Sequence, residues 1–340
     1  MADARRLVIP RNGPPSVLEV QPCEVREPGE GELRIRAAFA GINFADLMMR
    51  LGLYRPKPRL PFTPGYELSG TVDAVGEGVE GFEVGASVVA VVPDGAQQTH
   101  VLAPAAQTML LPEGVALEHA AALPVTYLTA WHMLVHLGNV QANETVLIHG
   151  IAGGVGTAAL QIAKLFLAEP VFGTASPAKA EGILKRRGRL LARTDFANDL
   201  MRQTKGRGAD HILDPIGGAH LRESYECLAP GGRLYAYGLS SAAPSSKFKP
   251  LAALKALWGM RGIGLSRMML ENRGIFGVHM GTFHEQDLLS KHLQAILGHV
   301  ENGKLEPVLD EVFPVEQAAA AHQRLHDRKN FGKVLLDLRG

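Results

Sequence analysis

The sequence predicts an α/β protein with two domains, one rich in β-strands and one built on a doubly wound parallel sheet. Its 340 residues are more than a domain of ordinary size holds. Short runs of alternating apolar and polar residues fill the first third of the chain, with glycines between them. In the middle third, apolar strand segments alternate with helical segments, which is typical of a parallel sheet covered by helices.

The β-rich part starts with residues 33–37, where apolar side chains alternate with arginines as in a half-buried strand. Residues 71–75 and 88–92 are further predicted strands, and the glycines between them supply tight turns. Short strands joined in this way predict a small barrel or sandwich. A last strand is expected at residues 334–336.

The parallel sheet is expected to use four apolar segments as strands: residues 145–149, 171–172, 211–214 and 233–237. A helix is predicted from about residue 155 to residue 167. Another helix is predicted to begin near Ser176-Pro177, because proline fits the first helical turn.

Two more helices are predicted outside this pattern. Residues 285–300 carry one apolar face, and Gly303 ends that helix. Residues 120–138 contain no charged side chain. We expect them to form one buried helix and not a membrane span, because Thr126 and His132 have no rationale in lipid.

Composition narrows the class of protein. Hydrophobic residues make up 46% and charged residues 20%, which is typical of globular proteins and not of disordered ones. A net charge of +1 gives no indication of a nucleic-acid partner. The two cysteines, Cys23 and Cys227, exclude a disulfide framework and a four-cysteine zinc site. With no signal peptide in residues 1–10, this usage favours the cytoplasm.

A glycine-rich loop, Gly150-Ile151-Ala152-Gly153-Gly154-Val155-Gly156, joins the first strand of the parallel sheet to its first helix. Residues without side chains let the backbone approach a pyrophosphate, and a helix N-terminus offers free N–H groups. The loop therefore predicts dinucleotide binding. The alternative is a tight turn that serves only helix–sheet packing.

The residues after the second strand of the sheet favour NADPH over NADH. An NAD site usually places a carboxylate about 20 residues after the loop to hold the ribose hydroxyl. Residues 173–176 contain none, and Glu169 lies at the wrong end of the strand. Lys179 follows in the first helical turn and can neutralise a 2′-phosphate, unless it is simply a solvated helix charge.

Three motifs in the N-terminal part are specific: Asn43-x-x-Asp46, Gly52-x-Tyr54 and Pro64-Gly65-x-Glu67-x-x-Gly70. With the glycine loop, they resemble the zinc-independent quinone oxidoreductases of the medium-chain dehydrogenase/reductase superfamily. Within these, the sequence is most similar to the vesicle amine transport protein family. The resemblance implies a GroES-like catalytic domain over residues 1–124 and 282–340, and a Rossmann domain over residues 125–281. It also implies a homodimer, with residues 275–278 as the edge strand.

The resemblance also implies the site. It gives catalytic roles to Asn43, Asp46 and Tyr54, on a segment that lines the cleft between domains in the resembled family. Cofactor contacts are implied for ten residues: Gly150, Gly153, Gly154, Val155, Gly156, Thr129, Thr174, Ser176, Lys179 and Asn330. The amide of Asn43 and the hydroxyl of Tyr54 are donors for an oxygen that gains charge. As alternatives, Asn43 caps the following helix and Tyr54 is an ordinary packing aromatic.

No metal is expected. In zinc alcohol dehydrogenases a Cys-His pair stands where this chain has Asn43-Phe44, and Gly-His-Glu stands where it has Gly65-Tyr66-Glu67. Asparagine and tyrosine are poor zinc ligands. His132 and His136 have metal-ligand spacing on one helix, but no carboxylate or thiol lies near them in the sequence, so we expect a packed face there.

The chain departs from the resembled family at residues 188–196, which lack the tyrosine that stands near the 2′-phosphate. Arg189 or Arg193 is the candidate substitute. The stretch Lys247 to Gly277 mixes apolar and basic residues. It is interpreted as a lid over a hydrophobic substrate, a membrane-contacting surface or a packed helical pair.

These features predict an NADPH-dependent enzyme that transfers hydride to a quinone or an activated enone. Without a Lewis acid, alcohol oxidation is unfavourable, whereas these acceptors are already electrophilic. The alternatives are an enoyl-thioester reductase, and a membrane-associated vesicle protein with little turnover. The partners expected are a small hydrophobic substrate and a second copy of the chain, and no nucleic acid.

Overall fold

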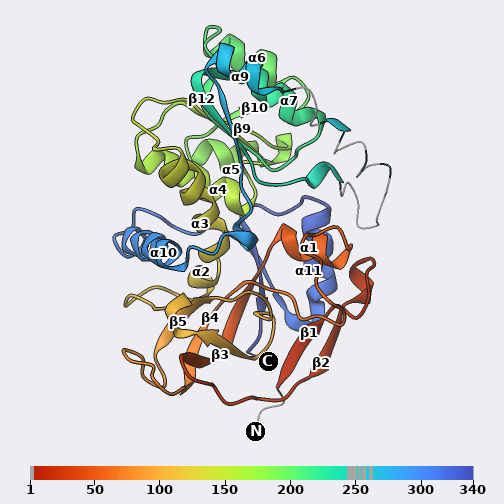
Figure 1. Ribbon diagram of the computed structural model, residues 1–340, viewed down its shortest axis with the longest axis vertical. Coiled ribbons are helices and arrows are strands. Elements are labelled where there is room, and N and C mark those ends of the chain that lie inside the picture. Colours follow the sequence, from red (N-terminus) through yellow and green to blue (C-terminus); the bar gives the residue numbers. More distant parts are fainter. Residues whose placement is uncertain (1–3, 243–250, 252–253, 255–257, 260–262, 340) are drawn as a thin grey trace. The chain divides into compact units, whose positions relative to one another are not determined.

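A computed structural model describes residues 4–242, 251, 254, 258–259 and 263–339 (Figure 1). The described residues fold into two compact units. Unit 1 holds residues 4–128 and 284–339, and unit 2 holds those between 129 and 283.

Unit 1 is built on a seven-stranded sheet in the order β14-β15-β3-β4-β5-β7, with β6 also paired to β3. Its strands are β3 (Glu32–Ile42), β4 (Glu67–Val75), β5 (Ser87–Val91), β6 (His100–Pro104), β7 (Thr108–Leu110), β14 (Leu309–Pro314) and β15 (Lys333–Asp337). A separate antiparallel pair consists of β1 (Arg5–Val8) and β2 (Glu19–Pro22). The β-rich domain predicted from the sequence is confirmed.

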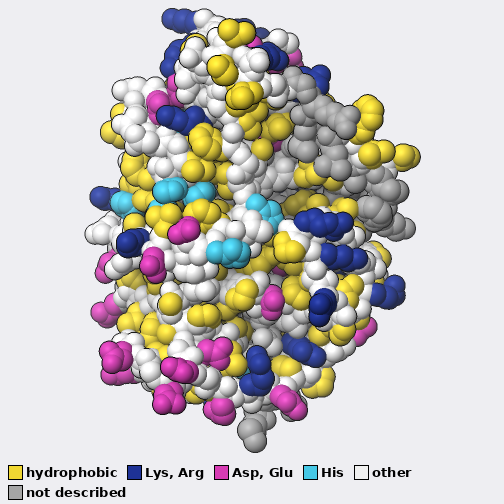
Figure 2. Space-filling view, in the orientation of Figure 1, with side chains coloured by type: hydrophobic (Ala, Val, Ile, Leu, Met, Phe, Trp, Pro, Cys, Tyr) yellow, Lys and Arg dark blue, Asp and Glu magenta, His cyan; other side chains and the backbone are white. Residues whose placement is uncertain are grey.

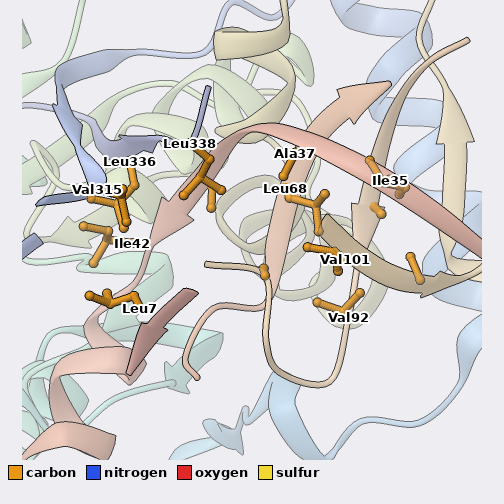
Figure 3. Packing of buried hydrophobic residues seen from close by; sticks show 14 of the residues in the cluster. Leu7, Ile35, Ala37, Ile42, Leu68, Val92, Val101, Val315, Leu336 and Leu338 are labelled. Atoms are coloured by element: carbon orange, nitrogen blue, oxygen red, sulfur yellow. The ribbon is translucent and has the colours of Figure 1, made fainter. Parts of the chain in front are cut away.

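The long strand β3 shows why this sheet forms. Leu33, Ile35 and Ala37 are buried, while the arginines between them lie toward the other face. The buried side chains join those of β4, β6 and β15 in one apolar core (Figure 3). β15 pairs antiparallel with β3, and Val334 lies opposite Ile42. This register brings the C-terminal strand to the end of β3, where the Asn43 motif begins.

The helices of unit 1 are α1 (Phe44–Arg50), α2 (Leu117–Ala121), α10 (Gln286–Glu301) and α11 (Ala318–His326), with the start of α3 (Pro124–Trp131). The prediction of one helix over residues 120–138 is wrong. The chain leaves the helix at Ala122, α3 starts at Pro124, and a π-helical segment follows at His132–Leu137. Proline lacks an N–H and tolerates only the first turn of a helix, so it starts a new one. No helix in the described part of the chain is long and apolar enough to cross a membrane.

Unit 2 contains a six-stranded sheet in the order β10-β9-β8-β11-β12-β13, and all its pairings are parallel. Its strands are β8 (Val146–His149), β9 (Val171–Thr174), β10 (Arg189–Leu191), β11 (Ala209–Asp214), β12 (Leu228–Ala236) and β13 (Gly274–Gly277). Its helices are α4 (Gly154–Leu165), α5 (Ala180–Lys185), α6 (Phe196–Gln203), α7 (Ala219–Glu226) and α9 (Leu265–Glu271). Short 3-10 helices in the two units are Pro15–Val17, Ala105–Gln107, Pro177–Lys179, Ser240–Ala242, Met280–Thr282 and Val315–Gln317.

The strand order of unit 2 confirms the doubly wound sheet. The chain runs outward from β8 to β10 on one side and from β11 to β13 on the other, so the order reverses between β8 and β11. In such sheets, ligands bind at the carboxyl ends of the strands on either side of this reversal. The glycine loop follows β8 directly, at that end. The predicted edge position of residues 275–278 is also seen, since β13 ends the strand order among the described residues.

Much of the stretch 247–277 lies outside the described residues. The part that is described includes α9, whose Leu265, Met269 and Leu270 are exposed. Figure 2 shows hydrophobic side chains at the end of unit 2 that carries α9. The interpretation of the stretch 247–277 as a lid, a membrane-contacting surface or a packed helical pair stays a prediction.

Candidate functional site

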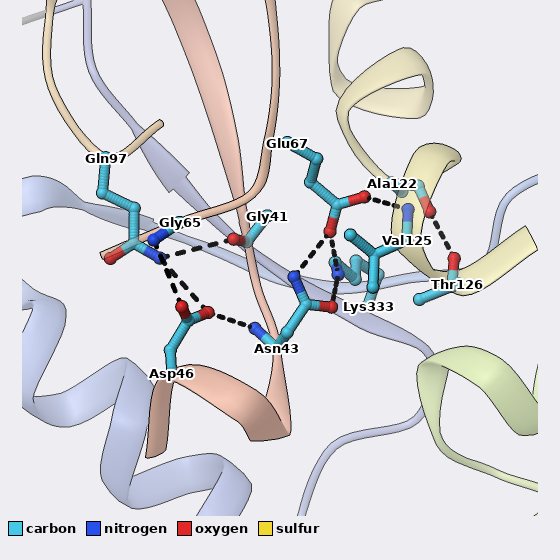
Figure 4. A network of polar contacts seen from close by, with 10 residues as sticks. All are labelled: Gly41, Asn43, Asp46, Gly65, Glu67, Gln97, Ala122, Val125, Thr126 and Lys333. Atoms are coloured by element: carbon cyan, nitrogen blue, oxygen red, sulfur yellow. Dashed lines mark hydrogen bonds and ion pairs between the residues drawn. The ribbon is translucent and has the colours of Figure 1, made fainter. Parts of the chain in front are cut away.

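Unit 1 contains a buried polar network centred on Asn43 and Glu67 (Figure 4). Asn43 follows β3 and is the N-cap residue of α1, and Glu67 begins β4. The Asn43 Nδ2 donates to Glu67 Oε1 over 2.9 Å. The Lys333 Nζ donates to Asn43 Oδ1 over 2.6 Å and also to Glu67 Oε1. Val125 N, in the first turn of α3, donates to Glu67 Oε2 over 2.6 Å. Glu67 therefore receives three donors from three different elements.

This network is almost entirely buried, and Asn43 keeps the largest exposed fraction of its three side chains. The exposed fraction is 8% for Asn43, 0% for Glu67 and 4% for Lys333. Gly41 makes room for the ion pair, because a Cβ there would lie 2.7 Å from Lys333 Cε and would overlap Glu67 Oε1. A buried carboxylate and ammonium require such close pairing, since either alone would be strongly destabilising. The sequence motifs did not indicate that Asn43 and Glu67 would pair with Lys333 and Val125.

Asp46 lies next to this network, in the first turn of α1. Its Oδ2 accepts from Asn43 N over 2.7 Å and its Oδ1 accepts from Gly65 N over 3.2 Å. Burial raises the pKa of Asp46 to about 7, although the two backbone hydrogen bonds and the charge of Lys333 act to lower it. Burial thus moves the pKa of this carboxyl from its ordinary acidic range toward neutral pH.

Tyr54 and Tyr66 form a pair of half-buried rings beside α1. Their ring centroids are 6.5 Å apart. Burial raises the pKa of each hydroxyl, so both stay protonated donors at neutral pH. The Tyr66 hydroxyl also points to Met49 Sδ at 4.0 Å. Tyr54 was predicted as a catalytic residue from the sequence, whereas Tyr66 entered that prediction only as a poor zinc ligand.

In unit 2 the glycine loop makes a tight turn between β8 and α4. Gly150 has a φ of +67°, and a Cβ at Gly156 would lie 2.7 Å from Ile151 Cα. Both positions therefore favour glycine. Gly153 is the N-cap residue of α4, which begins at Gly154 and carries Val155 in its first turn. The first N–H groups of a helix lack intrahelical acceptors, so this turn suits a pyrophosphate.

The predicted cofactor residues at and after the end of β9 differ in burial: Thr174 is buried, whereas Ser176 and Lys179 are half-buried. Thr174, the last residue of β9, is buried, and its Oγ1 lies 3.1 Å from His149 Nδ1. Ser176 and Lys179 lie at the two ends of the 3-10 turn that follows. Glu169 precedes β9 at the opposite end of the strand and pairs with Lys164 over 2.5 Å. It is therefore at the wrong end for a ribose contact, as predicted.

The two arginines proposed for the missing tyrosine lie at opposite ends of β10. Arg189 begins the strand and pairs in register with Phe172, at the amino end of the parallel sheet. There it lines a pocket of about 380 Å³ with Lys164, Glu169 and Arg187. Arg193 follows the end of β10 and is exposed. Of the two arginines, only Arg193 lies at the carboxyl ends of the strands, where the glycine loop also lies.

A second buried polar cluster, which no sequence motif predicted, lies at the same carboxyl ends of the strands. The Ser224 Oγ is 3.1 Å from His149 Nε2 and 2.9 Å from Asp214 Oδ2. His220 Nδ1 is 3.0 Å from the same Asp214 oxygen. Burial lowers the pKa of His149 to about 3. Hydrogen bonds from His220 and Gly217, with the adjacent imidazoles, hold the pKa of Asp214 far below its usual range despite burial.

The imidazoles and the carboxylate of this cluster offer ligand atoms that all lie within 4.8 Å of one another. The Ser224 hydroxyl bonds to two of the three groups and lies 3.5 Å from the third, His220 Nδ1. It thus occupies the position that a bound ion would need. The cluster is a closed network that ties β8, β9, β11 and α7 together at the edge carrying the glycine loop.

The remaining predicted residues are Thr129, Asn330 and the pair His132 and His136. Thr129 is buried in α3, in unit 2. Asn330 is buried in unit 1, where its Nδ2 donates to the Gly332 carbonyl over 2.9 Å. His132 and His136 stack with their ring centroids 5.1 Å apart.

The chemistry of the donor set in unit 1 does not fit a zinc ion. Asn43 and Tyr66 offer an amide and a protonated phenol, and zinc binds thiolate, imidazole and carboxylate. The carboxylate that is present, Glu67, already holds the ammonium of Lys333. A dication would have to displace that charge, so no catalytic step is assigned to a metal here.

Comparison with known proteins agrees with both units. Residues 29–113 match the alcohol dehydrogenase GroES-like domain, and residues 191–336 match the family described as zinc-binding dehydrogenase. The chain superposes on Escherichia coli quinone oxidoreductase complexed with NADPH, with a TM-score of 0.85, 26% identity and coverage of 98% and 99% of the two chains. It superposes on the CurK enoyl reductase with a TM-score of 0.84 at 28% identity, with the same coverage.

A GroES-like unit and a Rossmann unit with this loop and this buried network define an oxidoreductase of the medium-chain dehydrogenase/reductase superfamily. The human synaptic vesicle membrane protein VAT-1 homolog is 37% identical over 324 residues, which span 94% of this chain and 82% of that protein. The chain belongs to this VAT-1 family, and the family resemblance inferred from the motifs is confirmed.

Proposed function

We propose that the protein transfers hydride from NADPH to a quinone or an activated enone without a metal. The observation that carries the proposal is the network at Asn43: the residues that would hold a Lewis acid are replaced by an amide, a phenol and an ion pair. A substrate turned over here must be electrophilic already. Quinones and conjugated enones meet that requirement.

The glycine loop supports the cofactor assignment. The nicotinamide cofactor, when bound, supplies the hydride. The turn at Gly153–Gly156 would hold its pyrophosphate at the N-terminus of α4. Residues 173–176, at the end of β9, contain no carboxylate, whereas Lys179 and Arg193 lie beyond the carboxyl ends of β9 and β10. A cation beyond each of these two strands favours a 2′-phosphate over a free ribose hydroxyl.

Asn43 and Tyr54 would then donate hydrogen bonds to the acceptor oxygen as it gains charge. Asn43 is also the N-cap residue of α1, but its side-chain amide is bonded to Glu67 and Lys333 and not only to the helix. Asp46, with its raised pKa of about 7, is suited to hold or release a proton beside that amide.

The test is a panel of quinones, enones and enoyl thioesters, assayed with NADPH and with NADH. We expect turnover of quinones or enones with NADPH. Asn43→Ala and Tyr54→Phe should each lower kcat about tenfold. The free energy of unfolding should change by no more than about 1 kcal/mol, the cost that is typical of a lost helix cap. Variants that melt lower yet keep the parent rate on a good quinone would contradict these roles.

The second candidate is an enoyl-thioester reductase, favoured by the close superposition on the CurK enoyl reductase. Both candidates use the same hydride donor and an acceptor conjugated to a carbonyl. Turnover of the thioester arm of the panel, with quinones and simple enones inert, would select it.

A further inference from the structure

We propose that Lys333 is a positioning residue that fixes the hydrogen-bonding direction of the Asn43 amide and polarises it toward the acceptor. This inference rests on the proposed function, because it concerns the donor that meets the acceptor oxygen. Lys333 lies 290 residues from Asn43 in the chain and reaches it through the pairing of β15 with β3.

The two partners of the Asn43 amide leave it a single orientation. An ammonium only donates hydrogen bonds, and an ionised carboxylate only accepts them. The amide oxygen must therefore face Lys333 Nζ, at 2.6 Å, and the amide nitrogen must face Glu67 Oε1, at 2.9 Å. A flipped amide would set its N–H₂ against the ammonium and its oxygen against the carboxylate. The two charges therefore decide the orientation of the Asn43 amide.

This orientation also leaves one donor unused. The Asn43 Nδ2 carries two hydrogens, and one of them bonds Glu67. Among the described residues, the second has no acceptor. It is this hydrogen that we assign to the substrate oxygen.

The ammonium does more than orient the amide. The positive charge of the Lys333 ammonium lies against the Asn43 amide oxygen and draws electron density from the amide nitrogen. The free N–H therefore becomes a stronger donor. The charge is fixed before the reaction, because the Glu67 carboxylate holds the ammonium, Val125 N holds that carboxylate, and Gly41 leaves no spare volume. Preorganised donors of this kind stabilise developing negative charge without reorganisation. Lys333 thus supplies positive charge to the reacting oxygen through Asn43, without touching the substrate.

The experiment separates this role from a structural one. Lys333→Met leaves Glu67 buried without its partner, and this single variant is expected to be poorly stable. The double variant Lys333→Met/Glu67→Gln removes both charges and should recover thermal stability. Glu67→Gln alone and Lys329→Met, at an exposed lysine, serve as controls.

We expect the stable double variant to retain NADPH binding and to lose at least about tenfold in kcat relative to Lys329→Met, with a greater loss for a weakly electrophilic enone than for a good quinone. Equal losses for enone and quinone, or a kcat at the parent level, would overturn the proposal.

A readout without turnover tests the same claim in the free protein. With ¹⁵N-labelled asparagine, the side-chain amide protons of Asn43 should give two well-separated NMR signals, because one proton bonds a carboxylate and the other does not. In the double variant, the separation should fall further than in Glu67→Gln alone, which removes only the carboxylate. Equal separations in these two variants would show that Lys333 does not orient the amide. If the parent reduces none of the acceptors, the proposed function fails, while these signals still decide the positioning role.

Discussion

Acid should destabilise unit 1 through a buried arginine that pairs with no carboxylate in the described part of the chain. Arg50 is fully buried in α1, and its Nη2 lies 2.5 Å from His326 Nε2 in α11. Its Nε donates to His322 Nδ1 over 3.4 Å, and its Nη1 donates to the Gly13 carbonyl. Both imidazoles must be neutral to accept these bonds.

The size of the effect follows from His326. Burial and, next, the charge of Arg50 lower the pKa of His326 from its ordinary 6.5 to about 4, against a smaller opposing effect of Asp327. The unfolded chain therefore binds a proton at a higher pH than the folded chain does. The contribution of His326 to stability is complete above its unfolded pKa and is lost as the pH falls below it. Linkage gives a loss of about 2.5 kcal/mol by about pH 4.5.

The assay is denaturant unfolding followed by circular dichroism, at several pH values between about 7 and 4.5. His326→Gln keeps an oxygen that can accept from Arg50 and removes the titration, so it should lose about 2.5 kcal/mol less than the parent over this range. His284→Gln, at an exposed histidine, is the control and should follow the parent. If His326→Gln and the parent lose stability in parallel, the assignment of the acid sensitivity to His326 is refuted.

Three further outcomes are expected. Metal analysis of protein purified without chelator should find far less than one zinc per chain, because Asn43 and Tyr66 replace ligands; stoichiometric zinc would overturn the metal-free mechanism. Lys179→Ala should weaken NADPH binding about tenfold or more while sparing NADH, since a charge-assisted contact to phosphate contributes ~1.5–3 kcal/mol; equal losses for the two cofactors would exclude Lys179 as the reader of the phosphate. The chain should form a homodimer through the edge strand β13, which light scattering at micromolar concentration can check against the mass of a monomer.

The fold could be inferred from the sequence because local patterns specify it. The alternation in residues 33–37 appears as a strand with one buried face. The strand–loop–helix at residues 146–165 appears with Gly150 at a positive φ and Gly156 at a close backbone approach. These features depend on neighbouring residues along the chain, so periodicity and turn chemistry reveal them. The prediction of one helix over residues 120–138 was wrong because it followed composition. The apolar composition continues across Pro124, but the helix breaks there.

The sequence by itself also determined which residue types lie in the candidate site, through the motifs that contain Asn43, Asp46 and Glu67. Only the tertiary structure decided which side chains they contact. Lys333 meets Glu67 across 266 residues because β15 adds to β3 in one particular register, and Arg50 meets His326 because α11 packs on α1. A side chain's partner at such a separation depends on strand register and helix packing, and both are set by the burial of apolar faces from the whole unit. No local pattern around Lys333 or His326 carries that information.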